Sequence, residues 1–363
     1  MFSKAKPLPT ARLRPNTHPQ AIANAKPAGI LLGESCYWNP ESLANPHGAI
    51  IGSSGSGKTQ TLKAIAYSIL KQYPTRLIII DFHGDQEIPG ETCYRLNMTS
   101  EYGINPLVIN LDREGGGPNL QAIAVAMQFK KNLRLGPNQE GMILEIIQHC
   151  YQAKGILQTA YQTWLNSPPN FSEIATEIDN RIEAGCKESA KLKLKLAATF
   201  QYGIFSRPQP DLSPKHIRID LSKLPPELAA IAADSLANQL MNNHRLLGEN
   251  LGKIPRTILF IDEVKEMSHS QACNRITADG RKYGLGLWLW VATQRTQHLT
   301  PEVLSNTVTK IVLPVDASEV ANTAKKFRFS DDLIANLRPL NALIRLGTDT
   351  AKCEILPYFQ RCL

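Results

Sequence analysis

The chain has 363 residues, 43% of them hydrophobic and 20% charged, which is typical of a water-soluble globular protein with a substantial core. No apolar run is long enough to span a bilayer, and the N-terminus lacks the apolar segment of a signal peptide, so we expect a cytoplasmic protein without membrane insertion. The formal net charge of +8 is equally compatible with a polyanionic partner, such as nucleic acid, and with a basic surface that has no such partner.

The first 27 residues contain five prolines and several basic residues without any hydrophobic periodicity. This composition predicts an extended or disordered leader over residues 1–27. Two short runs, Gly29–Gly33 and Cys36–Trp38, then predict a small hairpin ahead of the main domain.

A phosphate-binding loop follows at Ile50–Thr61. Its core matches the pattern G-x-x-x-x-G-K-[ST], with an apolar strand before it and a helical pattern at 61–70 after it. In this motif the glycines let backbone N–H groups surround phosphate oxygens, and the helix N-terminus adds its positive dipole end. Lys58 is predicted to reach the β- and γ-phosphates of a nucleotide, and the Thr59 hydroxyl to ligate Mg²⁺. We assign nucleotide binding to Gly52, Ser53, Ser54, Gly55, Ser56, Gly57, Lys58, Thr59 and Gln60.

The next apolar run, Arg76–Asp81, is predicted to be a strand that ends at a carboxylate and leads into His83-Gly84-Asp85. Its position near the nucleotide edge leaves the functional and structural roles of His83 equally open. From about residue 119 onward the apolar spacing is helical, with helices predicted at 121–129, 139–151, 172–182 and 190–200. We therefore expect an all-helical insertion over residues 115–206 within an ATPase-type domain over residues 28–363.

Strand character returns after the insertion, and a helix is predicted over Pro226–Leu247. Alternation of strands and helices predicts an α/β fold with a mostly parallel sheet. The later predicted strands are at 216–221, 256–263, 284–293, 308–314 and 342–346.

Two carboxylates, Asp262 and Glu263, end one of these strands. A buried pair of this kind is costly unless a metal or hydrogen-bond donors satisfy it. We predict that Asp262 holds the hydration shell of Mg²⁺ and that Glu263 acts as the general base for the attacking water. Gln294, at the end of the next strand, is predicted to sense the γ-phosphate or that water. Among the nearby arginines, Arg281 is our first choice for a catalytic finger, with Arg275 and Arg295 behind it.

These motifs together resemble the HerA/FtsK superfamily of DNA-translocating ATPases, and the HerA-like branch most closely. The resemblance is carried by GSSGSGKT, IIIDFHGD, INPL, ILFIDEV, GRKYGLGLWLWVATQR and LSNTVTKIVL, over roughly residues 30–350. The chain is also similar to the ATPase part of DptH-type proteins of phosphorothioation-linked DNA restriction. Only about fifty residues precede the phosphate loop, too few for the β-barrel domain that HerA proteins usually carry there.

The resemblance implies a RecA-like P-loop NTPase core, a homo-hexameric ring, ATP and Mg²⁺ bound between subunits, and double-stranded DNA in a central channel. It also implies that an arginine such as Arg281 acts on the nucleotide of a neighbouring subunit. The expected function is an ATP-hydrolysing motor that translocates or unwinds DNA, in DNA processing or defence, with a partner nuclease. Two alternatives stay open: an ATPase of the type IV secretion or conjugation type, and a nucleotide-gated assembly module that regulates a partner effector.

Overall fold

The computed structural model describes residues 29–34, 36–43, 45, 47–267 and 270–362, so the predicted leader lies outside the described part. The hairpin predicted ahead of the main domain is confirmed: β1 (Ile30–Gly33) pairs antiparallel with β2 (Cys36–Trp38). The Trp38 indole N–H donates to the Thr309 hydroxyl at 3.0 Å, which fixes this hairpin against the main sheet.

A nine-stranded sheet forms the centre of the molecule, in the order β11-β10-β9-β3-β8-β7-β4-β6-β5. The seven strands from β9 to β5 pair in parallel, whereas β10 and β11 are antiparallel, so the prediction of a mostly parallel sheet is confirmed. The strands are β3 (Gly48–Ile51), β4 (Arg76–Asp81), β5 (Thr92–Arg95), β6 (His216–Asp220), β7 (Thr257–Ile261), β8 (Leu287–Thr293), β9 (Thr309–Val312), β10 (Asn341–Leu346) and β11 (Asp349–Glu354).

Two of these strands, β5 and β11, were not predicted from the sequence. Both are edge strands, and neither has the continuous apolar sequence of the strands at the centre of the sheet. β5 has only four residues, and β11 has one buried residue, Cys353. Their strand conformation depends on pairing with β6 and β10 respectively.

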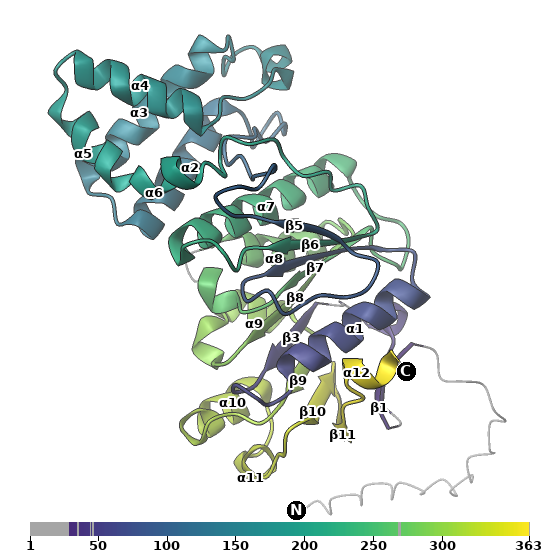
Figure 1. Cartoon of the computed structure of the whole chain (residues 1–363). Coiled ribbons are helices and arrows are strands. Elements are labelled where there is room, and N and C mark those ends of the chain that lie inside the picture. The colour runs from purple at the N-terminus through teal and green to yellow at the C-terminus, as the bar shows by residue number, and fades with distance from the viewer. Residues whose placement is uncertain (1–28, 35, 44, 46, 268–269, 363) are drawn as a thin grey trace, which may run out of the picture.

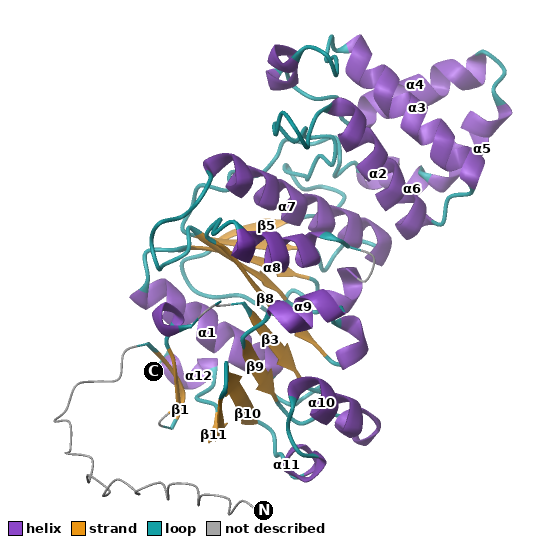
Figure 2. Ribbon diagram, turned by 180° about the vertical axis from the view of Figure 1, so that it is seen from behind, coloured by secondary structure: helices purple, strands orange, loops and turns teal. Residues whose placement is uncertain are grey.

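Helices cover both faces of the sheet (Figures 1 and 2). α1 (Lys58–Gln72) lies on one face, and α7 (Pro226–Leu247), α8 (Ala272–Lys282) and α9 (Pro301–Asn306) lie on the other. Successive strand residues point to opposite faces, so Ile79 packs in the core beneath α1 and Ile80 in the larger core beneath α7. Near the C-terminus are α10 (Val320–Phe327), α11 (Asp331–Ala335) and α12 (Tyr358–Arg361).

The chain between β5 and β6 forms a helical lobe next to the β5 end of the sheet (Figure 1). Three phenylalanines pack in its interior: Phe129 stacks on Phe171, and Phe205 meets both rings at an angle. The helix predicted at 190–200 is two helices, because the chain turns at Leu196. The five α-helices described here are α2 (Pro118–Leu133), α3 (Pro137–Ala153), α4 (Phe171–Glu183), α5 (Lys187–Lys195) and α6 (Ala197–Tyr202), and we propose to treat residues 115–206 as an insertion in a domain over 28–363.

Within the described residues, no helix is both long enough and apolar enough to pass through a membrane.

Candidate nucleotide-hydrolysis site

Four loops with polar side chains meet at the carboxyl edge of the sheet. β3, β8, β7 and β4 are consecutive neighbours, and they lead into the phosphate loop, Gln294, Asp262 and the loop after Asp81 respectively. Parallel sheets place their ligand sites at this edge, because all the strands end there in the same sense. Residues separated by more than 200 positions are thereby brought together.

The phosphate loop leads directly into α1. Gly57 adopts a φ of 103°, a left-handed conformation that favours glycine, and α1 begins at the next residue. Backbone hydrogen bonds fix the loop to its neighbours: Gly52 donates to the Thr293 carbonyl at 3.2 Å, Ser53 donates to the Pro314 carbonyl at 2.8 Å, and the Ser56 carbonyl accepts from Leu340 at 3.0 Å. The N-terminus of α1 therefore faces this edge, as phosphate binding requires.

The ammonium of Lys58 lies inside the loop. It donates to the carbonyl oxygens of Gly52 at 2.8 Å and Ser53 at 3.0 Å. Burial lowers the pKa of Lys58, and the nearby carboxylates of Glu263 and Asp262 oppose this effect. Lys58 is thus partly desolvated, and the two carboxylates favour its charged form. A cation of this kind is a suitable donor to phosphate oxygens.

Asp262 directly follows β7 and has 4% of its surface exposed. Its Oδ2 atom is buried and has no hydrogen-bond partner. Burial raises the pKa of Asp262 to about 7, with further contributions from the charges of Asp85 and Asp81, while a hydrogen bond from Gln86 opposes the rise. An unpartnered buried carboxylate oxygen is costly, so this position is suited to a cation or its water shell.

Glu263 is 2% exposed and has a φ of 74°, which is unusual for a residue with a side chain. Its carboxylate accepts hydrogen bonds from the Thr293 hydroxyl at 3.0 Å and from Gln294 Nε2 at 3.3 Å. Thr293 in turn lies 2.9 Å from His298 Nδ1. Backbone strain of this kind is found mainly at functional sites, where surrounding contacts hold it. Thr293 and His298 were not predicted, because only the hydrogen bonds that link His298 to Thr293 and Thr293 to Glu263 mark them.

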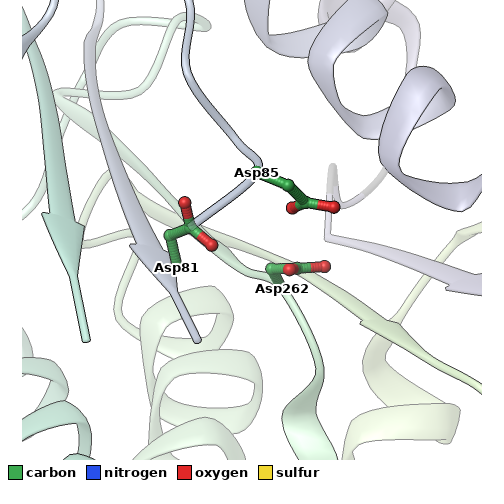
Figure 3. Close-up of side chains that lie close together, drawn as sticks. All are labelled: Asp81, Asp85 and Asp262. Carbon is green, nitrogen blue, oxygen red and sulfur yellow. The ribbon is translucent and has the colours of Figure 1, made fainter. Parts of the chain in front are cut away.

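A cluster of three carboxylates lies beside this pair (Figure 3). One oxygen each of Asp81, Asp85 and Asp262 lie within 4.8 Å of one another. The Thr59 hydroxyl donates to Asp85 Oδ2 at 3.2 Å, so the phosphate loop joins the same cluster. Hydroxyl and carboxylate oxygens are the ligands that Mg²⁺ prefers, so the Thr59 hydroxyl and the open Oδ2 of Asp262 fit that ion.

The remaining predicted residues are more dispersed. Gln60 Oε1 accepts the backbone N–H of Phe359 in α12 at 3.4 Å, and Arg295 and His83 are exposed. Arg275 donates to Asn238 Oδ1 at 3.0 Å and Asn242 Oδ1 at 3.1 Å, which ties α8 to α7. Arg281 belongs to α8, and its side chain lies outside the described part of the structure.

A cavity of about 410 Å³ lies apart from this edge, between α2, α7 and α8. Its walls include Gln128, Asp234 and Arg275, and the phosphate loop does not contribute to them.

Comparison with protein families identifies the chain. The family model described as "Helicase HerA, central domain" matches residues 33–240, more than half of the chain. The chain belongs to this family. It is therefore a P-loop ATPase of the HerA/FtsK type, and the resemblance seen in the sequence is confirmed. A comparison with curated protein sequences finds no match.

Solved structures share the fold of this HerA-type ATPase. VirB4 of Thermoanaerobacter pseudethanolicus superposes with a TM-score of 0.77 at 19% identity, covering 91% of this chain and 97% of that protein. The bacterial conjugative coupling protein TrwBdeltaN70 in its unbound form gives a TM-score of 0.62 at 15% identity, covering 92% and 89%. TrwB in complex with ADP and Mg²⁺ gives a TM-score of 0.61 at 14% identity, covering 92% and 90%. The RecA-like fold class is thus confirmed.

Proposed function

We propose that this HerA-type ATPase binds ATP and Mg²⁺ at the carboxyl edge of its sheet and uses hydrolysis to translocate along double-stranded DNA. The proposal is carried by one observation: Lys58 and Thr59 lie beside Asp262 and Glu263, although about 200 residues separate the two pairs. Cations for the phosphates and a carboxylate for the attacking water are the parts that phosphoryl transfer to water needs.

Each residue has a distinct task in this proposal. Lys58 leaves the carbonyls of Gly52 and Ser53 and donates to the phosphate oxygens. When bound, Mg²⁺ neutralises charge on the phosphates, and Thr59 and Asp262 would hold it. Glu263 accepts the proton of the water that attacks the γ-phosphorus, while the bond to the bridging oxygen breaks and ADP leaves. Thr293 and Gln294 hold the Glu263 carboxylate in place through their hydrogen bonds.

The assembly and partners belong to the same proposal. A homo-hexameric ring would let Arg281 of one subunit stabilise the transition state on its neighbour. The net charge of +8 supports DNA as the polyanion, as does membership of a family described as a helicase. A nuclease in DNA processing or defence is the proposed protein partner, and the cytoplasm the proposed location.

The test is ATP hydrolysis by the purified protein, with and without double-stranded DNA, at low and moderate salt, beside Glu263→Gln. We expect hydrolysis that DNA stimulates, stimulation that weakens with salt, and loss of activity in the variant. Hydrolysis that DNA does not change would contradict the translocase and favour a secretion-type motor or a nucleotide-gated assembly module.

A further inference from the structure

We propose that Asp85 is a further residue of the magnesium site: it accepts a hydrogen bond from the Thr59 hydroxyl and, together with Asp262, holds the water shell of the cation. This inference rests on the proposed ATP–Mg²⁺ function and adds a third side chain to Thr59 and Asp262. Asp85 ends the D-F-H-G-D segment, which begins at Asp81, the last residue of β4, and the proposed function above gives Asp85 no role.

The first argument is the contact between Asp85 and Thr59. Thr59 Oγ1 donates to Asp85 Oδ2 at 3.2 Å. A hydroxyl has one proton and two lone pairs, so a bond that takes the proton leaves the lone pairs for a cation. Groups that orient and polarise a metal ligand in this way commonly raise its affinity for the metal.

The second argument is the relation between Asp85 and Asp262. Their carboxyl groups lie next to each other, as Figure 3 shows, and one oxygen of each lies within 4.8 Å of the other. Two carboxylates this close repel each other unless a cation lies near them. Asp262 Oδ2 is buried without a partner, and Gln86 Oε1, also fully buried, has none either. Buried oxygen atoms with unused acceptor capacity beside two carboxylates point to a hydrated cation.

The third argument is the way the loop is held. Asp81 Oδ1 accepts the backbone N–H groups of His83 at 3.1 Å and Gly84 at 2.7 Å, and its Oδ2 accepts that of Gln86 at 3.0 Å. Gln86 Nε2 then donates to Asp85 Oδ1 at 3.0 Å. Asp81 is thereby occupied with shaping the loop, and Asp85, although exposed, is fixed in direction. The cluster thus divides into one residue that builds the loop and two that face the cation.

The test uses the full chain with a fluorescent, non-hydrolysable ATP analogue, titrated with Mg²⁺ for the wild type and Asp85→Asn. The asparagine has the same size and keeps a carbonyl for Gln86. We expect the Mg²⁺ concentration for half-maximal analogue binding to rise about tenfold in the variant. Analogue binding in EDTA should stay as in the wild type, because the phosphate loop itself is unchanged. Glu87→Gln is the matched control, since it removes an exposed carboxylate two residues away and should leave the Mg²⁺ dependence unchanged.

A second measurement separates this inference from the proposed function. The thermal unfolding midpoint is measured with Mg²⁺ or Mn²⁺ alone, and we expect either cation to raise it in the wild type more than in Asp85→Asn. An equal response of both proteins to the cation, or loss of analogue binding in EDTA in the variant, would overturn the role of Asp85. Failure of the wild type to bind the analogue with Mg²⁺ would instead overturn the proposed function, and the cation measurement would still decide the role of Asp85.

Discussion

Asp81 and Asp262 end neighbouring strands of the sheet, and both are almost fully buried, but their surroundings differ. Asp81 accepts three backbone N–H groups and lies 3.1 Å from the guanidinium of Arg218. Asp262 keeps one carboxylate oxygen without a partner, and its pKa is raised to about 7, mainly by burial. The same residue type at equivalent strand ends therefore serves two purposes.

The difference shows how a buried charge reveals its role. Donors around Asp81 offset its desolvation and leave no acceptor site for a ligand, so this carboxylate builds structure. Asp262 is left under-coordinated in the isolated chain, which is expected where a ligand completes the set. Both carboxylates are buried, so the number of hydrogen bonds that each accepts, and not its burial, distinguishes the structural residue from the one that is free to bind a ligand.

Asp81 also belongs to a buried network of ion pairs around Arg218. Only 3% of its side chain is exposed, and its nitrogens lie 3.1 Å from Asp81, 2.7 Å from Glu91 and 3.5 Å from Asp220. Burial acts to lower the pKa of Arg218, but hydrogen bonds to Glu91 and Asp81 and the charge of Glu91 outweigh it and raise the pKa above its usual range. Asp220 also forms an ion pair with Arg95 at 2.7 Å. Ion pairs therefore link β4, β6, β5 and the loop from β4 to β5 that contains Glu91.

The largest expected effect comes from Asp262→Asn compared with Asp81→Asn. We expect Asp262→Asn to lower ATP hydrolysis by about 10²–10³-fold, the typical loss when one electrostatic stabiliser is removed. Its thermal unfolding midpoint should not fall, because the change removes a poorly satisfied buried carboxylate. Asp81→Asn should lower that midpoint clearly, because the amide weakens the pair with Arg218. Equal midpoints for the two variants would break the comparison.

The next effect is on stability. Arg218→Met should lower the free energy of unfolding by about 3–5 kcal/mol, because it leaves buried carboxylates without their cation. Urea unfolding followed by circular dichroism measures this change. Lys191→Gln is the matched control: its pair with Glu188 is largely exposed, so the loss should be about 0.5 kcal/mol or less. A similar small loss for Arg218→Met would mean that backbone donors alone satisfy Asp81.

The smallest effect is a pH dependence from His216, at the start of β6. Its ring nitrogens are buried without hydrogen-bond partners, and burial lowers its pKa, with Glu91 opposing and Arg218 adding to the shift. The unfolded chain therefore takes up this proton at a higher pH than the folded one, so stability falls as the pH drops below about 6.5. Unfolding free energies at pH 7.5 and 5.5 should differ less in His216→Phe than in the wild type. An identical difference in both proteins would show that His216 is not a source of the pH dependence.

Much of the fold could be predicted from local patterns. The central strands are continuous apolar runs, and helix α7 has the predicted limits Pro226–Leu247. The motif at Gly52–Thr59 and the pair Asp262–Glu263 also stood out, because these residue types at strand ends have few structural uses. These predictions succeed because the spacing of apolar residues within a short stretch of sequence indicates which residues are buried and where a strand ends.

The sequence by itself thus determined the alternating α/β core, the phosphate loop, and the carboxylate pair Asp262–Glu263 at a strand end. Only the tertiary structure decided that β5 and β11 are strands, that the helical region breaks at Leu196, and that Asp81 builds a loop while Asp85 faces Thr59. The reason is physical: these features depend on hydrogen-bond and ion-pair partners such as Arg218, 137 positions from Asp81, and no local pattern encodes such a partner.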